Sequence, residues 1–380
     1  MFGLTEEHKI FQKTVKDFVD KEIRPNVAEW EAAGRTPRAF WKKCGELGFL
    51  GINYPEEFGG MNAEYTYTAI FIQEMGKCGS CGVALGISVQ TDMATPALAK
   101  HGNQFLKETY LAAAIRGDMI CAVGVTEPDH GSDVAAITTK AVKKGNSWII
   151  NGAKTFITNG IQADFVTLLA RTNDRPGYAG LSLFVVPTKL TGFSRGKILK
   201  KTCYQASDTA ELILQNVEVS EQHMIGEEGK GFIYQMEQFQ FERLAACLLS
   251  LGGLKRAYKL TKQFIQERQA FGVPLAKMQV TRHKMAQMLA EIKLIENSVN
   301  ACVMKANMGI DFTKDVSMLK LVAAQLQQKI LEECAQIHGG CGLMEEYEVA
   351  RYFRDSKLLG IGGGTNEIMK EIICKYEGLE

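Results

Sequence analysis

The spacing of apolar residues changes twice along the chain, and no other feature constrains the fold as strongly. Residues 1–117 show helical spacing, residues 118–228 shift towards the alternation of β-strands, and residues 229–380 return to helical spacing. Runs of helices and runs of strands bury their apolar faces in different layers, so this order indicates an α+β protein with separate domains. We therefore expect a helical domain, a β-rich domain and a second helical domain, divided at these positions.

Helical spacing is clear in both outer regions. Near the N-terminus, Phe11, Val15 and Phe18 fall on one helical face, and Thr5 is suited to cap that helix. Near the C-terminus, one apolar stripe precedes a terminating Gly339 and consists of Leu319, Val322, Ala323, Leu326, Ile330, Cys334 and Ile337.

The middle region contains five short runs rich in β-branched and aromatic residues, separated by turn signals. These runs are MICAVGV, SWIINGAKTFIT, DFVTLLA, LSLFVVP and AELILQNVEV. Within the second run, Asn151–Gly152 predicts a tight turn, followed by a strand that ends at Phe156–Thr158.

Composition excludes several classes of protein. The chain has 44 basic and 43 acidic residues among 380, a balance that argues against nucleic-acid or membrane-surface binding. No apolar run is long enough to span a bilayer, and the N-terminus turns acidic within a few residues, unlike a targeting segment. Ten scattered cysteines suggest reduced thiols. We expect no stable membrane association, and a location in the cytoplasm of a bacterium or, after processing, in the mitochondrial matrix of a eukaryote.

Generic cofactor motifs are absent from the sequence. GIGGGT misses the dinucleotide-binding pattern and does not follow a strand, and GEEGKG lacks the Ser or Thr of a P-loop. The single pair Cys78–Cys81 has redox or metal spacing but no second pair nearby, so a structural role is favoured. The six histidines show no i, i+4 pairing, and we expect no metal site.

Longer segments carry a stronger signal. VTEPDHGSDVA, INGAKTFITNG, ERQAFGVPLAKMQ, QIHGGCGLMEEY and RDSKLLGIGGGTNEI occur in this order across nearly the whole chain. Together they resemble the signatures of the acyl-CoA dehydrogenase family. The resemblance implies an N-terminal helical domain, a middle β-barrel-like or sandwich domain and a C-terminal four-helix bundle, with FAD between the last two. It also implies self-association as a homotetramer or homodimer.

The resemblance also implies positions for the cofactor. Residues matched to the lining of the flavin or the substrate thioester are Val125, Thr126, Gly131 and Ser132. Those matched to the cover of the flavin ring are Phe156, Ile157 and Thr158, with Phe156 in place of the more common Trp. Those matched to the FAD site of a neighbouring subunit are Arg268, Phe271, Gln279, Gln336, Gly339 and Gly340. Thr365 and Glu367 begin a helix whose free N–H groups suit the FAD pyrophosphate.

The expected reaction needs a base that removes the proton α to a thioester carbonyl while the β-carbon gives hydride to the flavin. Many members carry this base as Glu in a YEGT segment, but Gly363 occupies that position here. Other branches carry the base in an ERL motif, which matches Glu242 in QFQFERLAA. Ala245, Ala246 and Leu249 stand on the same helical face, so we expect a raised pKa for Glu242. The Gly363 N–H is then expected to hold the thioester carbonyl.

Neighbouring positions complete the expected substrate site. By the same resemblance, Arg243 contacts CoA, and Gln240 replaces an Asp found near CoA in several members. Residues 203–205 read Cys-Tyr-Gln where the family usually has Gly-x-Arg, which removes any charge contact made by that Arg. Several segments are most similar to citronellyl-CoA dehydrogenase-like and long-chain members, which favours a long or methyl-branched acyl chain.

We therefore expect dehydrogenation of an acyl-CoA to the trans-2-enoyl-CoA, with electrons passed to an electron-transfer flavoprotein. Two alternatives remain open. An acyl-CoA oxidase would use the same base with oxygen as acceptor, although such chains are generally longer. A catalytically silent binding or assembly protein would explain the missing YEGT glutamate.

Overall fold

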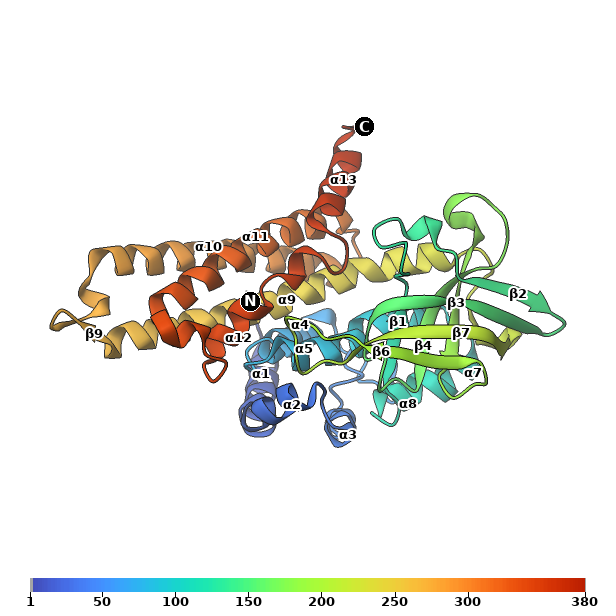
Figure 1. Cartoon of the computed structure of the whole chain (residues 1–380), viewed down its shortest axis with the longest axis horizontal. Coiled ribbons are helices and arrows are strands. Elements are labelled where there is room, and N and C mark those ends of the chain that lie inside the picture. The colour runs from blue at the N-terminus through green and yellow to red at the C-terminus, as the bar shows by residue number, and fades with distance from the viewer. Residues whose placement is uncertain (1–2, 380) are drawn as a thin grey trace.

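The computed structural model describes residues 3–379 and consists of two helical regions and one β-sheet region (Figure 1). This arrangement confirms the three-part fold expected from the sequence. The N-terminal helices are α1 (Glu6–Phe18), α2 (Val27–Ala33), α3 (Arg38–Glu46), α4 (Tyr65–Met75), α5 (Cys81–Ser88), α6 (Pro96–His101), α7 (Gln104–Leu106) and α8 (Ala112–Ile115). Three π-helical turns interrupt them, namely η1 (Val19–Ile23), η4 (Val89–Ala94) and η5 (Lys107–Leu111).

Local sequence explains how α1 begins. Thr5 has extended backbone angles, and its hydroxyl accepts a hydrogen bond from the His8 N–H while the His8 ring returns a contact to the Thr5 N–H. This reciprocal cap satisfies two N–H groups that the helix leaves free. Val15 and Phe18 are buried on the inner face of α1, as their spacing predicts.

The middle region is a mixed sheet of eight strands. They are β1 (Cys121–Gly124), β2 (Lys140–Lys144), β3 (Ser147–Thr158), β4 (Phe165–Arg171), β5 (Leu181–Pro187), β6 (Phe193–Ile198), β7 (Thr209–Ser220) and β8 (Met224–Ile225). Their order is β6-β7-β3-β2-β4-β5-β8, and β1 runs parallel to β4. All five strands expected from the sequence are present, together with β2, β6 and β8.

The predicted turn at Asn151–Gly152 is wrong. β3 continues through both residues, and its pairing with β7 shifts register between Ile150 and Gly152. Gly152 adopts a φ of 156° at this bulge, and a Cβ built there would lie 2.3 Å from Thr139 Oγ1. The Asn-Gly pair therefore marks a bulge where another backbone approaches closely, instead of a chain reversal.

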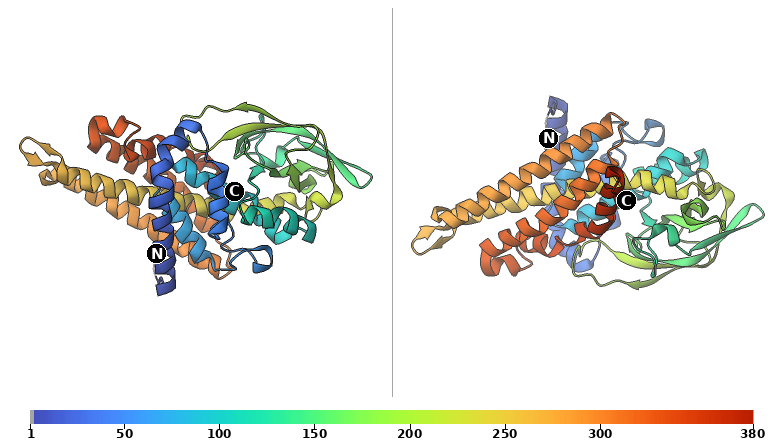
Figure 2. Two further views of the ribbon diagram at one scale, coloured as in Figure 1. Left: turned by 90° about the horizontal axis from the view of Figure 1, so that it is seen from below. Right: turned by 90° about the horizontal axis from the view of Figure 1, so that it is seen from above.

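The C-terminal region contains three long helices and two short ones. They are α9 (Gly231–Glu267), α10 (Gln279–Asn307), α11 (Thr313–His338), α12 (Glu348–Asp355) and α13 (Asn366–Glu377). A small hairpin of β9 (Gln269–Ala270) and β10 (Val273–Pro274) joins α9 to α10 at the end of the bundle furthest from the β-sheet (Figures 1 and 2). Gly339 ends α11 as predicted, with a φ of 59°. The predicted stripe on α11 is buried or partly buried except at Val322, which is 47% exposed.

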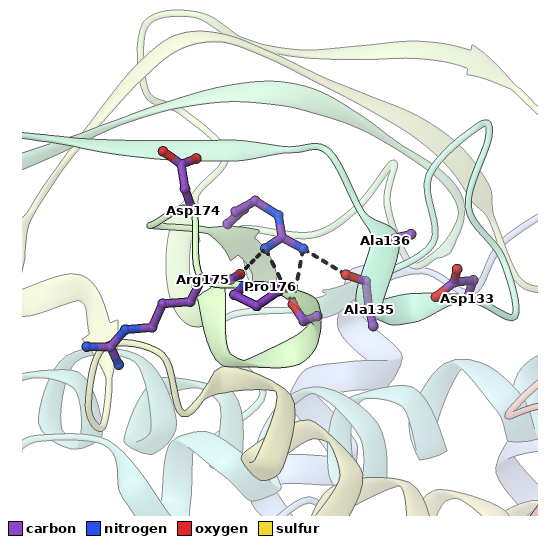
Figure 3. Close-up of a pocket in the computed structure, with 8 residues that line it drawn as sticks. Asp133, Ala135, Ala136, Asp174, Arg175 and Pro176 are labelled. Atoms are coloured by element: carbon purple, nitrogen blue, oxygen red, sulfur yellow. Dashed lines mark hydrogen bonds between the residues drawn. The ribbon is translucent and has the colours of Figure 1, made fainter.

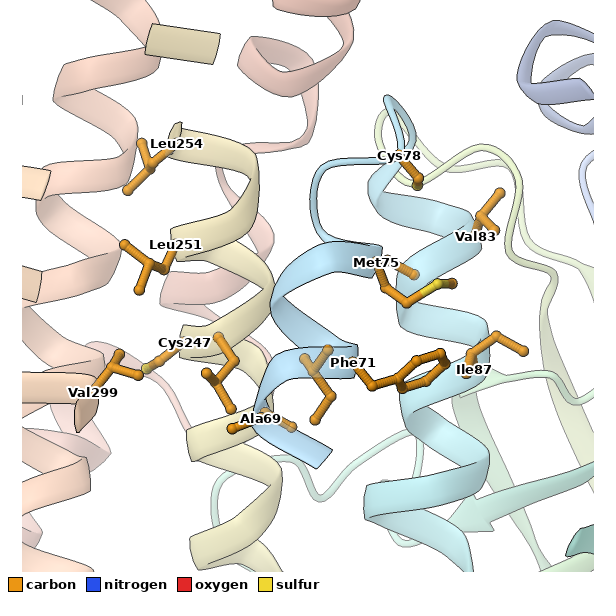
Figure 4. Packing of buried hydrophobic residues seen from close by; sticks show 14 of the residues in the cluster. Ala69, Phe71, Met75, Cys78, Val83, Ile87, Cys247, Leu251, Leu254 and Val299 are labelled. Carbon is orange, nitrogen blue, oxygen red and sulfur yellow. The ribbon is translucent and has the colours of Figure 1, made fainter. Parts of the chain in front are cut away.

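Helix α9 packs against α4 of the N-terminal region, α10 and α11 within one apolar core (Figure 4). The backbones of α4 and α9 meet at glycines. A Cβ built on Gly76 would lie 2.3 Å from Leu249 O, and one built on Gly252 would lie 2.2 Å from Gln73 O. Near the start of α9, a Cβ on Gly231 would similarly lie 2.4 Å from the Ser182 carbonyl carbon in the sheet. These close approaches fix α9 against both neighbouring regions.

Candidate active site

Glu242 lies in the first third of α9, and its side chain is buried. The residue is 9% exposed, and its Oε2 atom has no hydrogen-bond partner within the described chain. Burial raises the pKa of the carboxyl group to about 7, against the opposing positive charges of Arg243 and Lys320. A carboxyl group with this pKa exchanges a proton readily near neutral pH.

The glycine segment of the sequence forms a loop beside this carboxylate. The loop joins the short turn η11 (Leu358–Gly360) to α13, and Gly363 and Gly364 have φ angles of 65° and 97°. A Cβ built on Gly363 would lie 3.2 Å from Glu242 Oε1. A side chain at residue 363 would therefore occupy the space that the Glu242 carboxylate reaches. The two positions at which the sequence resemblance placed the expected base therefore lie next to each other in this structure.

Two buried cations hold this loop by its carbonyl groups. Arg243 Nε donates to Gly363 O at 3.1 Å, and Lys320 Nζ donates to Leu359 O at 2.8 Å and Gly364 O at 2.6 Å. Every side-chain hydrogen bond found for these cations within residues 3–379 goes to backbone carbonyls. The loop thus engages Arg243 Nε and Lys320 Nζ, and within residues 3–379 neither cation forms a direct ion pair with the Glu242 carboxylate.

Thr365 caps α13, because its hydroxyl accepts a hydrogen bond from the Ile368 N–H. Glu367 is exposed in the first turn of that helix. The Gly363 N–H makes no hydrogen bond to another described residue. The loop thus offers the free Gly363 N–H close to Glu242 and a helix N-terminus just beyond it.

A buried ion pair connects the two β-region segments expected to face the flavin. Lys154 on β3 is fully buried, and its Nζ lies 2.9 Å from Glu127 Oε1 and 3.0 Å from Val125 O. Glu127 also accepts hydrogen bonds from the backbone N–H groups of Thr138 and Thr139. Desolvation opposes ionisation of both groups, but the Lys154 charge and these donors hold the pKa of Glu127 at about 2. Sequence reasoning missed this pair.

The segments on either side of the ion pair present the predicted residues. The Thr155 N–H donates to Thr126 O at 2.9 Å, which joins the two segments directly. Phe156 is 69% exposed at a φ of 58°, within a register shift between Lys154 and Ile157 that turns its ring outward. Ile157 is buried and Thr158 half-buried. An exposed aromatic ring held at a strained backbone position is suited to cover a flat cofactor ring.

The bend that carries Gly131 and Ser132 is exposed, and no atom lies within 4 Å of a Cβ built on Gly131. A hollow of about 460 Å³ opens beside it, between Asp133 and the loop at Asp174–Gly177 (Figure 3). Arg171 braces that loop, because its guanidinium donates to Ala135 O at 2.7 Å and to Gly177 O at 3.3 Å. Arg171 is a further residue that sequence reasoning did not identify.

Another group of predicted residues lies far from Glu242 in the same chain. Arg268 follows the last residue of α9, about 39 Å along the helix from Glu242 at ~1.5 Å per residue. Phe271 is 98% exposed at the tip of the β9–β10 hairpin, and Gln279 begins α10. The end of α11 lies beside them, since the rings of Phe264 and His338 stack at 4.3 Å, so the exposed Gln336, Gly339 and Gly340 join this surface. These residues cannot complete the Glu242 site of their own chain.

The remaining predicted positions are also placed. Gln240 is half-buried on α9 next to Phe241. Tyr204 has a φ of 55°, and its N–H donates to Asp355 Oδ1 at 2.8 Å, so the Cys203–Gln205 loop docks onto the end of α12. Cys78 and Cys81 are free thiols, and Cys81 lies beside the Tyr204 side chain.

Comparisons with known proteins identify the class of protein that this fold and site define. Residues 5–118, 122–217 and 229–376 match the N-terminal, middle and C-terminal domains of acyl-CoA dehydrogenases. The chain belongs to the acyl-CoA dehydrogenase family. It is accordingly an FAD-dependent oxidoreductase.

Individual relatives cover the whole chain. The mitochondrial long-chain specific acyl-CoA dehydrogenase of Mus musculus is 36% identical over 98% of this chain and 86% of its own length. The short-chain specific acyl-CoA dehydrogenase of Clostridium acetobutylicum is 34% identical over 98% of both chains. The crystal structure of an acyl-CoA dehydrogenase from Geobacillus kaustophilus is 39% identical over 99% of both chains, with a TM-score of 0.96.

Two further features bear on function. None of the helices between residues 3 and 379 is long and apolar enough to cross a membrane. In the same part of the chain, no group of three or more His, Cys, Asp or Glu side chains is arranged to hold a metal ion.

Proposed function

We propose that the chain removes the α-proton of an acyl-CoA thioester with Glu242 and releases a trans-2-enoyl-CoA. One observation carries this proposal: the Glu242 carboxylate reaches the space that a side chain at Gly363 would fill. The missing glutamate of the YEGT segment is thereby replaced from α9. A silent binding protein would not need a buried, unpaired carboxyl group at this point.

Residues of the chain have separate roles in the proposed reaction. Glu242, with a pKa of about 7, accepts the α-proton at a carboxylate oxygen. The free N–H of Gly363 donates to the thioester carbonyl and stabilises the negative charge that develops there. Bound FAD supplies the acceptor for hydride from the β-carbon. Glu242 is 9% exposed on the helical face that it shares with Ala245, and this burial keeps water from the base.

The cofactor is assigned to the surface beside the Val125–Ser132 and Phe156–Thr158 segments. The N-terminus of α13, with Thr365 and Glu367, is assigned to the pyrophosphate. Arg268, Phe271 and the α11 end would complete the FAD site of a neighbouring subunit, because they lie far from the Glu242 site of their own chain. We therefore propose a homotetramer or homodimer as the working form.

Substrate and partner follow from the family and from sequence details. Arg243, Gln240 and Ser132 are assigned to CoA, although Arg243 Nε is engaged with Gly363 O and only its terminal nitrogens remain for a ligand. A long or methyl-branched acyl chain and an electron-transfer flavoprotein as acceptor are proposed. The cytoplasm or the mitochondrial matrix is the proposed location.

Anaerobic mixing of the purified yellow protein with acyl-CoAs of graded length and branching tests these assignments. The wild-type flavin is expected to bleach, fastest with long or branched chains. Glu242→Gln should retain FAD and bind acyl-CoA, yet bleach about 10²–10⁴-fold more slowly. The matched control Glu332→Gln, an exposed carboxylate on α11, should bleach like the wild type.

The outcomes separate the alternatives. A Glu242→Gln variant that keeps most of the wild-type rate would refute the assignment of Glu242 as the base. Absence of bleaching with every acyl-CoA would favour the silent protein, and rapid reoxidation of the bleached flavin by air would identify an oxidase.

A further inference from the structure

Lys320 is a fully buried lysine that the proposed reaction does not yet use. It lies on α11, and its side chain is 0% exposed. A buried ammonium group is costly unless its hydrogen bonds are satisfied and its charge is compensated nearby. Its location between the base and the glycine loop suggests why such a group is retained.

The Lys320 side chain reaches the space shared by Glu242 and Gly363. A Cβ built on Gly363 would lie 3.6 Å from Lys320 Cε and 3.2 Å from Glu242 Oε1. The ammonium group then donates to carbonyls on both sides of Gly363, at Leu359 and Gly364. A single side chain thus fixes the loop at two points that flank the free Gly363 N–H.

We propose that Lys320 is a positioning residue for the reaction, which holds the Gly363 N–H towards the substrate carbonyl and keeps Glu242 able to release its proton at neutral pH. This inference rests on the assignment of Glu242 as the base. The loop accepts the lysine's hydrogen bonds, and the charge acts on Glu242 through space.

The charged groups that act on Glu242 are few. Arg243 comes from its own helix and Lys320 from α11, and both lower the pKa that burial raises. No other charged group of the described chain contributes to the change in this pKa. Loss of Lys320 therefore leaves Arg243 as the single favourable charge, and the carboxylate becomes harder to form.

The test is the pH dependence of anaerobic flavin reduction in Lys320→Met, which keeps the volume of the side chain and removes its charge and donors. The midpoint of the profile is expected to move to higher pH. Below the midpoint, the rate should fall about tenfold for each pH unit by which the midpoint moves. The loss should shrink as the pH rises. Lys314→Met is the control, because Lys314 is a partly exposed lysine of α11 that pairs with Glu377 on α13.

A second variant separates charge from packing. Lys320→Arg keeps a cation with several donors, and its midpoint should stay at the wild-type value even if its rate falls. If Lys320→Met does not retain FAD, the inference is tested by the pH profile of flavin reduction in Lys320→Arg. A Met variant with an unmoved midpoint, or an Arg variant with a midpoint moved as far as that of Met, would overturn the inference.

These outcomes are distinct from failure of the proposed function. If Glu242→Gln kept the wild-type rate, the base assignment itself would fail. If Glu242→Gln were inactive and the Lys320→Met midpoint were unmoved, only the role of Lys320 would fail.

Discussion

Replacing Glu242 by glutamine should stabilise the protein at alkaline pH, although it removes the proposed base. The unperturbed pKa of 4.5 describes the unfolded chain, and burial raises the pKa to about 7 in the folded protein. Between these values the folded state binds more protons than the unfolded state. Linkage then makes the free energy of unfolding fall as the pH rises through this window. Burial of the charged carboxylate therefore costs no stability below pH 4.5, and its full cost is reached above about pH 7.

The size of the penalty follows from the width of the window. About 2.5 pH units at ~1.36 kcal/mol each give about 3 kcal/mol as an upper bound. A glutamine side chain carries no charge to desolvate but has buried donors of its own to satisfy, which offsets part of the gain. We compare the free energy of unfolding of Glu242→Gln with that of the wild type. This difference should be about 1–3 kcal/mol more favourable to the variant at pH 8.5 than at pH 5.

Urea unfolding of the FAD-loaded proteins at pH 5 and pH 8.5 measures this difference. The Glu332→Gln control should follow the wild type at both pH values, because that carboxylate is exposed. The reasoning is refuted if the gap between Glu242→Gln and the wild type is the same at both pH values, or if the wild type is the more stable protein at pH 8.5.

Four further outcomes are expected. The wild-type rate of anaerobic flavin reduction should rise with pH and level off above a midpoint near 7, because the ionised form of Glu242 is the proposed base; a flat profile from pH 5 to 9 would contradict this. The free energy of unfolding of Gly363→Ala, measured with urea, should be about 1–2 kcal/mol lower than that of the wild type, since the φ of Gly363 is 65°. The variant should also reduce its flavin more slowly, because its Cβ crowds Glu242; an unchanged rate would show that the substrate does not use this space. Lys154→Met should lose about 3–5 kcal/mol by urea unfolding, because it leaves Glu127 buried without its cation; wild-type stability would disprove the pairing. Phe271→Ala should retain less FAD on dilution in gel filtration while the melting temperature of the apoprotein stays the same, and full FAD retention would argue against a contact between subunits.

The sequence predicted most of the fold because apolar spacing reflects burial. Strands β3, β4, β5 and β7 each bury several side chains, so their patterns stood out. β2 and β6 did not, because their sequences KAVKK and FSRGKI expose most side chains. Asn151–Gly152 was misread because a turn and a bulge favour the same residue types. The boundaries at 117/118 and 228/229 remain predictions.

The candidate site could be predicted only in part. A sequence motif predicted Glu242 as the base, and the spacing of apolar neighbours such as Ala245 predicted that its pKa would be raised. The Glu127–Lys154 pair joins residues 27 positions apart, and no local pattern reports such a contact. Lys320 left one signal: it follows Val316 by four positions and precedes Ala323 by three, so a lysine stands on the buried face of α11.

The glycine contacts of α9 have a consequence for how this protein can change its substrate. Helix α9 carries Glu242 and is held against α4 at Gly76 and Gly252, and against the sheet at Gly231. With backbones already in contact, the helix has no room to tilt or slide towards a larger or smaller acyl group. New specificities should therefore arise by exchange of side chains around a stationary α9, and an alanine at Gly252 should be harder to tolerate than most substitutions in the pocket wall.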